Sequence, residues 1–414
     1  MPIQLIKRML ILVKQNLSIL LFGKTFTVPS LGSMTLDKDD VIIAKEWLKT
    51  RNRWQNPKIV QQYEENFAKW NGSKHAFAFM GGRVALSACI AALDLKHGDE
   101  VIIPGYTCVV VLNSLHYAGV KVVFSDIELD TFGLDVEQLE HKINENTRAI
   151  LLHHLYGLVC RDYESILQLA KKRGLRIIED CAHAAGALFK GVKVGNRGDL
   201  AFYSSEQSKI FNTIQGGIVS TNDDELAVRL SKYRDEAPSP DENLIEKQLY
   251  NIILNYYQFK HPWRWCFGIF AEIIWGHMRL ISTTSSETLG IKPVDYGMKM
   301  PAPIAAIGLN QLRKIDTYNE LRRAQAKHWD TWCDNNGYTK PFILPESLPV
   351  FLRYPVLVEQ EKKKSLMWAL RREKIIPGVW FLSNAHPAQH KIEGCPNADV
   401  AVKRCINFPC LTGF

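Results

Sequence analysis

Residues 176–183 read Arg-Ile-Ile-Glu-Asp-Cys-Ala-His, and this stretch decides the fold class of the chain. Its short apolar run ends in a carboxylate, Asp180, and a histidine, His183, follows three residues later. The pattern predicts a β-strand that delivers polar side chains to its carboxyl end. On its own, Asp180 is equally well explained as the N-cap of a helix. The neighbouring sequence has to decide between these two interpretations.

Short β-rich runs alternate with helical patterns on both sides of this stretch. Such alternation predicts an α/β fold in which a mostly parallel sheet carries helices on both faces. In these folds ligands bind at the carboxyl ends of the strands, in the loops that follow them. The predicted strands are residues 75–79, 100–103, 121–124, 149–153, 176–178, 200–203 and 217–220, and the helical segments between them include 83–93, 107–118, 136–142 and 163–173.

The chain has 414 residues, of which 46% are hydrophobic and 23% are charged. A chain of this length is expected to hold two domains. We predict a basic amphipathic segment at 1–36, a large domain at 37–235 that holds the sheet, an aromatic-rich insertion at 236–299 and a smaller C-terminal α/β domain at 300–414. Within these parts we expect helices over 37–70, a long helix over 302–332, a strand over 351–358 and a helix near 363–374.

Composition excludes several classes of protein. The net charge of +8, from 51 basic and 43 acidic residues, is mild for this length and does not indicate nucleic acid as a partner. The nine cysteines are scattered without a Cys-x-x-Cys pair, which argues against a disulfide framework and against a zinc site. We therefore expect no metal and a cytoplasmic location. No window of about 20 uninterrupted apolar residues predicts a transmembrane span.

Two segments keep a peripheral contact with the inner membrane open as an alternative. Residues 1–36 contain basic side chains, short apolar runs and no acid, so they suit a membrane surface, a partner or a helix packed on the protein's own body. Residues 250–281 are dense in tyrosine, phenylalanine and tryptophan. Such a stretch favours core or subunit interface over a membrane-surface element, because most aromatic side chains are buried.

A second informative stretch, residues 199–209, reads Asp-Leu-Ala-Phe-Tyr-Ser-Ser-Glu-Gln-Ser-Lys, and residues 215–217 read Gln-Gly-Gly. We expect another apolar strand to end here, with Lys209 just beyond it and the glycine pair tightening the return strand. A lysine and a strand-end carboxylate in this order make sense for pyridoxal phosphate. The amine forms an imine with the cofactor's aldehyde, and the carboxylate of Asp180 keeps the pyridine nitrogen protonated.

A third stretch, residues 79–86, reads Phe-Met-Gly-Gly-Arg-Val-Ala-Leu and predicts a strand, a glycine turn and a helix. At such a turn the backbone N–H groups and the helix dipole can hold a phosphate. Arg83 would add a bidentate, charge-assisted contact. Ser204 and Ser205, at the end of the neighbouring predicted strand, are further candidate phosphate donors.

Together the three stretches resemble the DegT/DnrJ/EryC1/StrS family of pyridoxal-phosphate-dependent sugar aminotransferases, which share the fold type I scaffold. The resemblance implies a large domain with a mostly parallel seven-stranded sheet and a smaller C-terminal domain. It covers about residues 70–223 and resumes towards the C-terminus. Further matching segments are Gly-Asp-Glu-Val-Ile-Ile-Pro at 98–104, Leu-Tyr-Gly at 155–157, Phe-Lys-Gly at 189–191, Met-Pro-Ala-Pro-Ile-Ala-Ala-Ile-Gly-Leu-Asn-Gln-Leu at 300–312, and Cys-Pro-Asn-Ala-Asp with Ile-Asn-Phe-Pro within 395–409.

The resemblance implies a role for each matching residue. Lys209 is the lysine that forms the imine, and Asp180 is the partner of the pyridine nitrogen. His183 stands near the phenolic oxygen of the ring. The remaining cofactor contacts that it implies are Gly82, Arg83 and Ser204 around the phosphate, and either Cys108 or Tyr106 at the position that stacks on the ring.

The chain also departs from the family pattern. Glu206 replaces a histidine and Ser208 replaces a threonine in the segment before the lysine, and the insertion at 236–299 has no counterpart in the simplest members. Glu206 is a candidate for substrate binding. His154 and His386 are candidates for lining the sugar pocket, with a structural hydrogen bond as the alternative for both histidines.

The activity implied by the resemblance is transfer of an amino group from glutamate to a keto sugar, expected to be nucleotide-linked, with release of 2-oxoglutarate. Such sugars serve cell-surface polysaccharide or secondary-metabolite biosynthesis. A homodimer is implied as well. Two alternatives stay open: a pyridoxal-phosphate-binding sugar dehydratase or regulatory protein that does not transaminate, and a peripheral membrane assembly protein. Retention of Lys209 argues against the dehydratase, because some dehydratase relatives replace this lysine with histidine.

Overall fold

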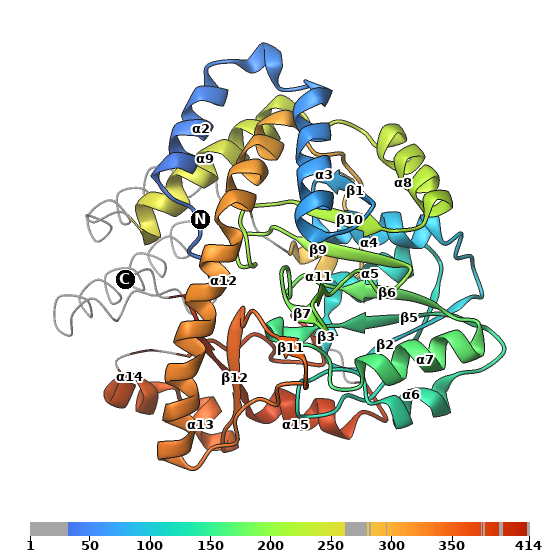
Figure 1. Ribbon diagram of the computed structural model, residues 1–414, viewed down its shortest axis with the longest axis vertical. Helices are drawn as coiled ribbons and strands as arrows, with labels where there is room; N and C mark the ends of the chain where they lie inside the picture. The colour runs from blue at the N-terminus through green and yellow to red at the C-terminus, as the bar shows by residue number, and fades with distance from the viewer. Residues whose placement is uncertain are drawn as a thin grey trace.

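The computed structural model describes residues 32–260, 280, 283–294, 296–373, 375, 377–388 and 392–411. Its centre is a seven-stranded sheet in the order β1-β10-β9-β6-β5-β2-β4 (Figure 1). All seven strands expected from the sequence are present. They are β1 (His75–Phe79), β2 (Glu100–Pro104), β4 (Lys121–Ser125), β5 (Thr147–His153), β6 (Arg176–Asp180), β9 (Leu200–Ser204) and β10 (Gly217–Thr221).

The sheet is mostly parallel, as expected. Strands β9, β6, β5, β2 and β4 pair in parallel, and only β10 runs antiparallel to its two neighbours, β1 and β9. The parallel register places Asp180 beside His153 on one side and Phe202 on the other. Because the carboxyl ends of parallel strands meet at one edge, the polar ends of β5, β6 and β9 converge there.

Both faces of the sheet are buried, which explains why its strands are almost continuously apolar. Along β1, Ala76 and Ala78 belong to one hydrophobic core, and Phe77 and Phe79 belong to a second core on the opposite face. The alternation follows from the two-residue period of a β-strand. The first core is completed by α3 (Pro57–Asn71), α7 (Tyr163–Arg173) and α12 (Ala302–Asn336), and the second by α4 (Gly82–Ala92), α5 (Val109–Tyr117) and α8 (Asp224–Glu236).

Local sequence sets the ends of these helices. For α3, the side chain of Asn56 accepts a hydrogen bond from Lys58 N and Pro57 occupies the first helical position, so both features start the helix. The helix stops at Gly72, which adopts a φ of 80° that other residues rarely tolerate. Other helices of the large domain are α2 (Lys38–Leu48) and α6 (Val136–Lys142).

The α12 helix runs along the length of the molecule and joins its two halves (Figure 1). Its first part packs on α3, and its last part packs in a separate hydrophobic cluster that contains Trp329, Trp332 and Phe408. That cluster belongs to the C-terminal part of the chain. The C-terminal elements are the antiparallel pair β12 (Arg353–Leu357) and β14 (Cys405–Pro409), with α13 (Gln360–Lys364), α14 (Met367–Glu373) and α15 (Pro396–Arg404).

Two expected elements differ. The helix expected from residue 107 begins only at Val109, because Thr107 and Cys108 form a short strand. The single helix predicted near 363–374 is two short helices, α13 and α14, which are separated at Ser365 and Leu366. The C-cap Ser365 has extended backbone angles, so the chain changes direction there although its composition is helix-compatible. The separation lets Trp368 on the second helix donate to the backbone oxygen of Lys362 on the first, at 3.0 Å.

The predicted insertion contributes two described helices, α9 (Glu242–Phe259) and α11 (Ser285–Thr288). The α9 helix packs against α2 and α12, and its last-turn aromatic side chains are half-buried. The membrane alternatives depend on segments 1–36 and 250–281, and most of both segments lies outside the described residues. In the part of the chain that the structure describes, no helix combines the length and apolar character needed to cross a membrane.

Candidate active site

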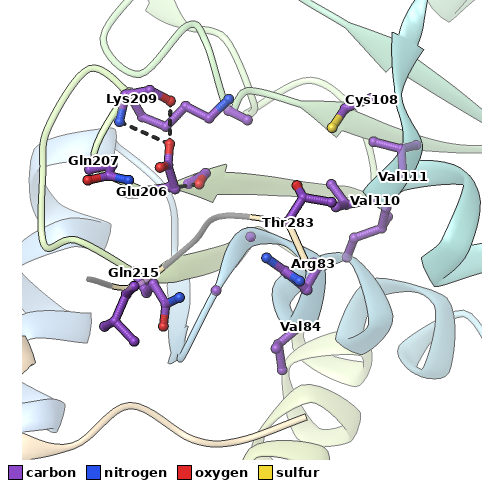
Figure 2. A pocket seen from close by; sticks show the side chains of 18 of the residues that line it. Arg83, Val84, Cys108, Val110, Val111, Glu206, Gln207, Lys209, Gln215 and Thr283 are labelled. Carbon is purple, nitrogen blue, oxygen red and sulfur yellow. Dashed lines mark hydrogen bonds between the residues drawn. The ribbon is translucent and has the colours of Figure 1, made fainter. Parts of the chain in front are cut away.

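A cavity of about 950 Å³ opens at the carboxyl edge of the sheet. In Figure 2, Lys209 lies at the upper left of this space, Cys108 at the upper right and Arg83 below them. The structure brings almost all of the predicted site residues to this cavity. Those that line it are Gly82, Arg83, Cys108, His154, Asp180, His183, Ser204, Glu206, Lys209 and His386.

Lys209 contacts a histidine and a tryptophan. Its Nζ lies 2.9 Å from His183 Nε2 and 4.7 Å from the centre of the Trp380 ring. The Tyr156 N–H donates to His183 Nδ1 at 3.3 Å, so the ring proton belongs on Nε2. His183 Nε2–H therefore donates to Lys209 Nζ, which requires a neutral amine. Trp380 packs edge-on against His183 with 4.6 Å between ring centres.

Burial also favours the neutral amine. It lowers the pKa of Lys209 below its ordinary value, and the charge of the buried Arg353 acts in the same direction. The nearby Glu206 and Asp180 carboxylates oppose this decrease. Burial lowers the pKa of His183 even further, well below its usual range, so the imidazole is neutral as well. Both shifts favour the uncharged forms of these two nitrogen bases, in agreement with the hydrogen bond that joins them.

Asp180 lies at the end of β6, where the sequence placed it. Its Oδ1 accepts a hydrogen bond from Ala182 N at 2.9 Å. The residues that follow form turns and no helix, so the N-cap interpretation is wrong. Burial raises the pKa of Asp180 to about 6, while Lys209 acts to lower it. A buried carboxylate with a raised pKa gains from a cationic partner, which a protonated pyridine nitrogen would provide.

The glycine turn before α4 is packed closely against the end of β9. A Cβ added at Gly82 would come within 3.0 Å of the Ser204 Cβ, and one added at Gly217 would collide with the Gly81 carbonyl. A larger residue at 217 would require a backbone shift, and one at 82 would press on the Ser204 side chain. The α4 helix has no side-chain cap at its N-cap Gly81. These features make a cradle of small groups in which a phosphate fits the first turn of the helix.

Arg83 has a partner that sequence reasoning missed. Its Nη1 forms an ion pair with Glu287 Oε1, and the Glu287 side chain is almost fully buried. Glu287 Oε2 accepts hydrogen bonds from the N–H and the hydroxyl of Thr284, so the carboxylate is held in a capping box of α11. Asn113 on α5 donates to the Glu287 backbone oxygen at 2.7 Å. The insertion is thus attached directly to the predicted phosphate turn.

Glu206 lines the cavity three residues before the lysine. Its Oε2 accepts hydrogen bonds from the N–H and the hydroxyl of Ser208, and the dashed lines of Figure 2 meet at Glu206. Lys209 N donates to the Glu206 backbone oxygen at 2.9 Å. The two residues that depart from the family pattern therefore pair with each other. Together they close the turn that presents Lys209.

The α12 helix holds the loop that follows Lys209. Gln311 Oε1 accepts from Asn212 N at 3.1 Å, and Arg322 Nη2 donates to the Ile210 backbone oxygen at 2.8 Å. Both side chains are fully buried or nearly so. Gln311 in turn donates to Asp40 on α2 at 2.9 Å. Two residues of one long helix thus fix the backbone on the carboxyl side of the lysine.

The remaining predicted residues have mixed placements. His154 is fully buried, with Nδ1 accepting from Cys160 N at 3.2 Å and Nε2 contacting Glu179 at 3.1 Å, which favours the structural alternative. His386 lies beside Cys108 in the register of two short strands, β13 (Ala385–His386) and β3 (Thr107–Cys108). Tyr106 does not line the cavity. Its hydroxyl bonds with that of Tyr156 at 2.9 Å inside a hydrophobic cluster.

Two groups of described residues have the spacing of metal ligands. The first is His154, Glu179 and Cys181, in which Glu179 already accepts hydrogen bonds from five donors. The second is the acidic cluster at 37, 39 and 40, and Lys314 Nζ contacts all three carboxylates. In both groups protein hydrogens already occupy the acceptor oxygens. The expectation of no metal stays a prediction.

Some cavity residues carried no sequence motif. Trp380 lies in the loop-rich tail, and Glu287 and Tyr296 lie in an insertion that the resemblance does not cover. Tyr296 bonds with Ser114 at 2.9 Å and reaches the same turn as Arg83. The one available indication was composition, because an aromatic-rich insertion has to cover some surface of the protein.

Known proteins resemble this chain over most of its length. The model of the DegT/DnrJ/EryC1/StrS aminotransferase family matches residues 36–414. The GDP-perosamine synthase of Caulobacter vibrioides is 39% identical over 301 residues, which cover 72% of this chain and 69% of that protein. A dTDP-3-amino-3,6-dideoxy-alpha-D-galactopyranose transaminase of Aneurinibacillus thermoaerophilus is 39% identical over 176 residues, 42% of this chain and 48% of that protein.

Solved structures share the fold. An aminotransferase from Psychrobacter cryohalolentis superposes with a TM-score of 0.69 at 23% identity, covering 91% of this chain and 93% of that one. The E. coli GDP-4-keto-6-deoxy-D-mannose-3-dehydratase, with bound hydrated pyridoxal phosphate, gives a TM-score of 0.70 at 22% identity and covers 92% of this chain and 94% of that one. These neighbours confirm the fold type I scaffold. With a family model that spans nearly the whole sequence, the chain belongs to the DegT/DnrJ/EryC1/StrS aminotransferase family.

Proposed function

We propose that this protein transfers an amino group from glutamate to a nucleotide-linked keto sugar, using pyridoxal phosphate. The observation that carries the proposal is that Lys209 and Asp180, from two neighbouring parallel strands and their loops, line one cavity with the glycine cradle. The names of the relatives support the substrate class, since they include a GDP-linked and a dTDP-linked amino-sugar enzyme. The sugars expected are those of cell-surface polysaccharides or secondary metabolites.

The residues present fit the cofactor. Asp180 would hold the pyridine nitrogen, and the turn at Gly82 with Ser204 would hold the phosphate. Cys108 lines the cavity where Tyr106 does not, so Cys108 is our candidate for the position over the ring. When bound, pyridoxal phosphate supplies an aldehyde that reacts with amines and a ring that accepts the electron pair released from the substrate carbon.

Lys209 moves the proton. An ordinary lysine with a pKa near 10.4 is a poor base at neutral pH. The burial of Lys209 and the hydrogen bond from His183 Nε2–H both favour the neutral amine. Its Nζ would accept the proton that leaves the α-carbon of the amino donor and would return a proton to the acceptor carbon in the second half of the reaction. The hydrogen bond from His183 uses the one lone pair of the neutral amine, so it would have to open before Nζ accepts that proton.

The runner-up is a sugar dehydratase, the activity named for two of the structural neighbours. Lys209 in a position to accept and return a proton favours amino transfer over that alternative. Two further proposals follow from the family. We infer that the protein acts as a homodimer whose partner subunit completes the site, and that it works in the cytoplasm.

A panel of keto-sugar nucleotides tests the activity. Purified protein loaded with pyridoxal phosphate is incubated with glutamate and, separately, GDP-4-keto-6-deoxymannose, dTDP-4-keto-6-deoxyglucose or their UDP-linked counterparts, and the products are read by mass spectrometry. We expect the mass of an amino sugar nucleotide together with 2-oxoglutarate. A product that has lost water without gaining nitrogen would support the dehydratase. If glutamate leaves the visible spectrum of the bound cofactor unchanged, amino transfer from this donor would be contradicted.

A further inference from the structure

The α9 helix carries a row of amide side chains on the side that faces the cavity. Gln248, Asn251, Asn255 and Gln258 follow one another at spacings of three, four and three residues, which places them on one face of the helix. Three of them, at 251, 255 and 258, line the same cavity as Lys209. We call these four residues the amide row. It belongs to the insertion at 236–299, outside the segments whose motifs carry the family resemblance.

The first half of the amide row attaches α9 to the site. Gln248 is fully buried, and its Nε2 donates to the backbone oxygen of Gln215, beside the glycine pair of β10, at 3.0 Å. Asn251 Oδ1 accepts from Leu280 N at 3.3 Å. These bonds fix which face of α9 is turned to the cavity. Asn255 and Gln258 follow on the same face of the helix, and they therefore line the same cavity.

The chemistry of the amide row suits a neutral, hydroxylated ligand. A primary amide donates and accepts hydrogen bonds without carrying charge, and a sugar hydroxyl does the same. Leu254, Phe259 and Tyr296 line the cavity around the amides. Apolar walls with a few placed polar groups are the usual form of a site that binds a small ring. The apolar C–H face of a sugar can pack on these walls.

A diphosphate suits this wall less well. Phosphate groups are bound through charge-assisted hydrogen bonds from arginine or lysine, and the amide row has no charged member. Arg83 lines the same cavity, but it is ion-paired with the buried Glu287. The wall that α9 provides is therefore matched to the sugar part of the acceptor and not to its diphosphate.

We infer that the amide row, through Asn255 and Gln258, binds the hydroxyl groups of the acceptor sugar, so that the insertion supplies the acceptor subsite of this protein. The inference rests on the proposed function. The glutamate half of the reaction does not involve the acceptor, so a change in the amide row should leave that half intact. The experiment can therefore contradict the acceptor subsite without contradicting the proposed amino transfer, and the reverse.

The test compares Asn255→Ala, Gln258→Ala and the double variant with Asn243→Ala. Asn243 is an exposed amide on the same helix that does not line the cavity, so it is the matched control. Asn255→Asp keeps the shape of the side chain and guards against a folding defect in the alanine variants. Each protein is loaded with pyridoxal phosphate. Conversion of the cofactor by glutamate is followed by its absorbance, and KM is measured for GDP-4-keto-6-deoxymannose and dTDP-4-keto-6-deoxyglucose. Calorimetry measures the Kd of the same sugar nucleotides and of free GDP and dTDP in the absence of turnover, so that the two kinds of ligand can be compared.

We expect each single substitution to raise the KM or Kd of the sugar nucleotide about 3- to 10-fold, and the double variant about 10- to 50-fold, because each removes one or two hydrogen bonds to a neutral ligand. The glutamate step and the Kd of the free nucleoside diphosphate should change less than about twofold, and Asn243→Ala should resemble the wild type. A KM that stays within twofold in the double variant would overturn the inference. So would an equal loss of affinity for the free nucleoside diphosphate, or a wild type that binds neither sugar nucleotide.

Discussion

At the residue scale, the site depends on how burial sets two protonation states. Burial lowers the pKa of Lys209, and the hydrogen bond from the His183 N–H also favours its neutral amine. Burial raises the pKa of Asp180, which favours its neutral acid. Both effects oppose charge on these two side chains when the cofactor is absent. A cofactor with a protonated ring nitrogen would reverse the second effect, because it pairs the carboxylate with a cation. The charge of the site therefore depends on whether the cofactor is bound.

The first prediction concerns Lys209 itself. Replacing Lys209 with alanine should abolish the visible absorbance that arises when the cofactor aldehyde is bound to an amine of the protein. Amino transfer should fall about 10²- to 10⁴-fold, the usual contribution of a positioned general base. The measurements are the absorbance spectrum of loaded protein and single-turnover kinetics with glutamate. Lys190→Ala, at a lysine that pairs with Glu164 on the surface, is the control. Wild-type turnover in Lys209→Ala would contradict the assignment.

The second prediction concerns pH. Without the cofactor, burial raises the pKa of Asp180 to about 6, above its ordinary 3.8. Between these two pH values the folded state therefore holds a proton that the unfolded state has released. The resulting contribution to stability is complete below about pH 4 and is lost as the pH rises through about 6. Cofactor binding requires the ionised carboxylate, so the affinity for pyridoxal phosphate should fall as the pH is lowered through about 6.

Fluorescence titrations of pyridoxal phosphate between pH 5 and 8 (roughly the range around this pKa) measure the effect. Asp180→Asn supplies the matched control, because an amide has the same shape and does not titrate. We expect the variant to bind the cofactor more weakly at pH 8 and to lose most of the difference between high and low pH. The titration of the cofactor's own groups is common to both proteins and cancels in the comparison. An identical pH profile in the two proteins would contradict the role of Asp180.

At the element scale, helices from outside the sheet hold the site in place. The short helix α11 presents Glu287 to Arg83, and the long helix α12 presents Gln311 and Arg322 to the lysine loop. In both cases a side chain on a helix bonds to a turn at the carboxyl edge of the sheet. Such turns carry the chemistry in α/β proteins, and they need support because they have few hydrogen bonds of their own.

The third prediction tests the contact between α11 and the glycine turn. Glu287→Gln leaves the Arg83 charge without its carboxylate and should lower the free energy of unfolding by about 2–4 kcal/mol, as expected when one partner of a largely buried ion pair is removed. Arg83→Met should be destabilising as well. The double variant should be less destabilised than the sum of the two, because the pair is lost only once. Urea unfolding of the four proteins gives the coupling energy. Additive effects would show that the two side chains do not interact.

The fourth prediction tests the support from α12. Gln311→Leu and Arg322→Met each remove a buried hydrogen bond to the lysine loop and should cost about 1–3 kcal/mol of stability. They should also slow cofactor conversion by glutamate, since Lys209 loses its fixed position. Lys327→Met, at an exposed site on the same helix, is the control. Loss of stability with an unchanged rate of cofactor conversion would indicate that these residues only hold the fold together.

At the scale of the whole molecule, the cavity is built from parts far apart in the sequence. The sheet provides the floor, the insertion one wall, and the C-terminal part provides Trp380 and His386. Figure 1 shows how α12 passes from the sheet to the C-terminal elements. The hydrophobic cluster around Trp329 and Phe408, whose rings stack 4.2 Å apart, fixes that second half.

The fifth prediction concerns the oligomer. Sedimentation of the purified protein should give twice the chain mass of 47.2 kDa at micromolar concentration. If the partner subunit completes the site, dilution to the monomer should lower the specific activity in step with the loss of dimer. Activity per chain that stays constant while the dimer dissociates would show that each chain has a complete site.

The sequence by itself determined the strands, the order of the motifs and the residues at the strand ends. A strand buried on both faces, such as residues 149–153, is a local run of apolar residues, so it can be recognised without knowing its neighbours. The same holds for Asp180 and Lys209, because parallel strands bring their carboxyl ends to one edge. The helix expected near 363–374 was wrong because the local sequence carries no signal for its interruption. Nothing in the composition of residues 363–374 indicates the change of direction at Ser365.

Only the tertiary structure decided which side chains face the cavity. Arg83 and Glu287 lie in different parts of the chain, and their ion pair exists only because α11 packs on α5. Sequence pattern left Tyr106 and Cys108 as alternatives. The packing around Tyr156 buries the tyrosine elsewhere and leaves the cysteine in the cavity. The amide row has helical spacing in the sequence, but its direction depends on the bonds that attach α9 to Gln215 and Leu280. Contacts between distant segments are set by the packing of whole elements, and a local pattern holds no information about that packing.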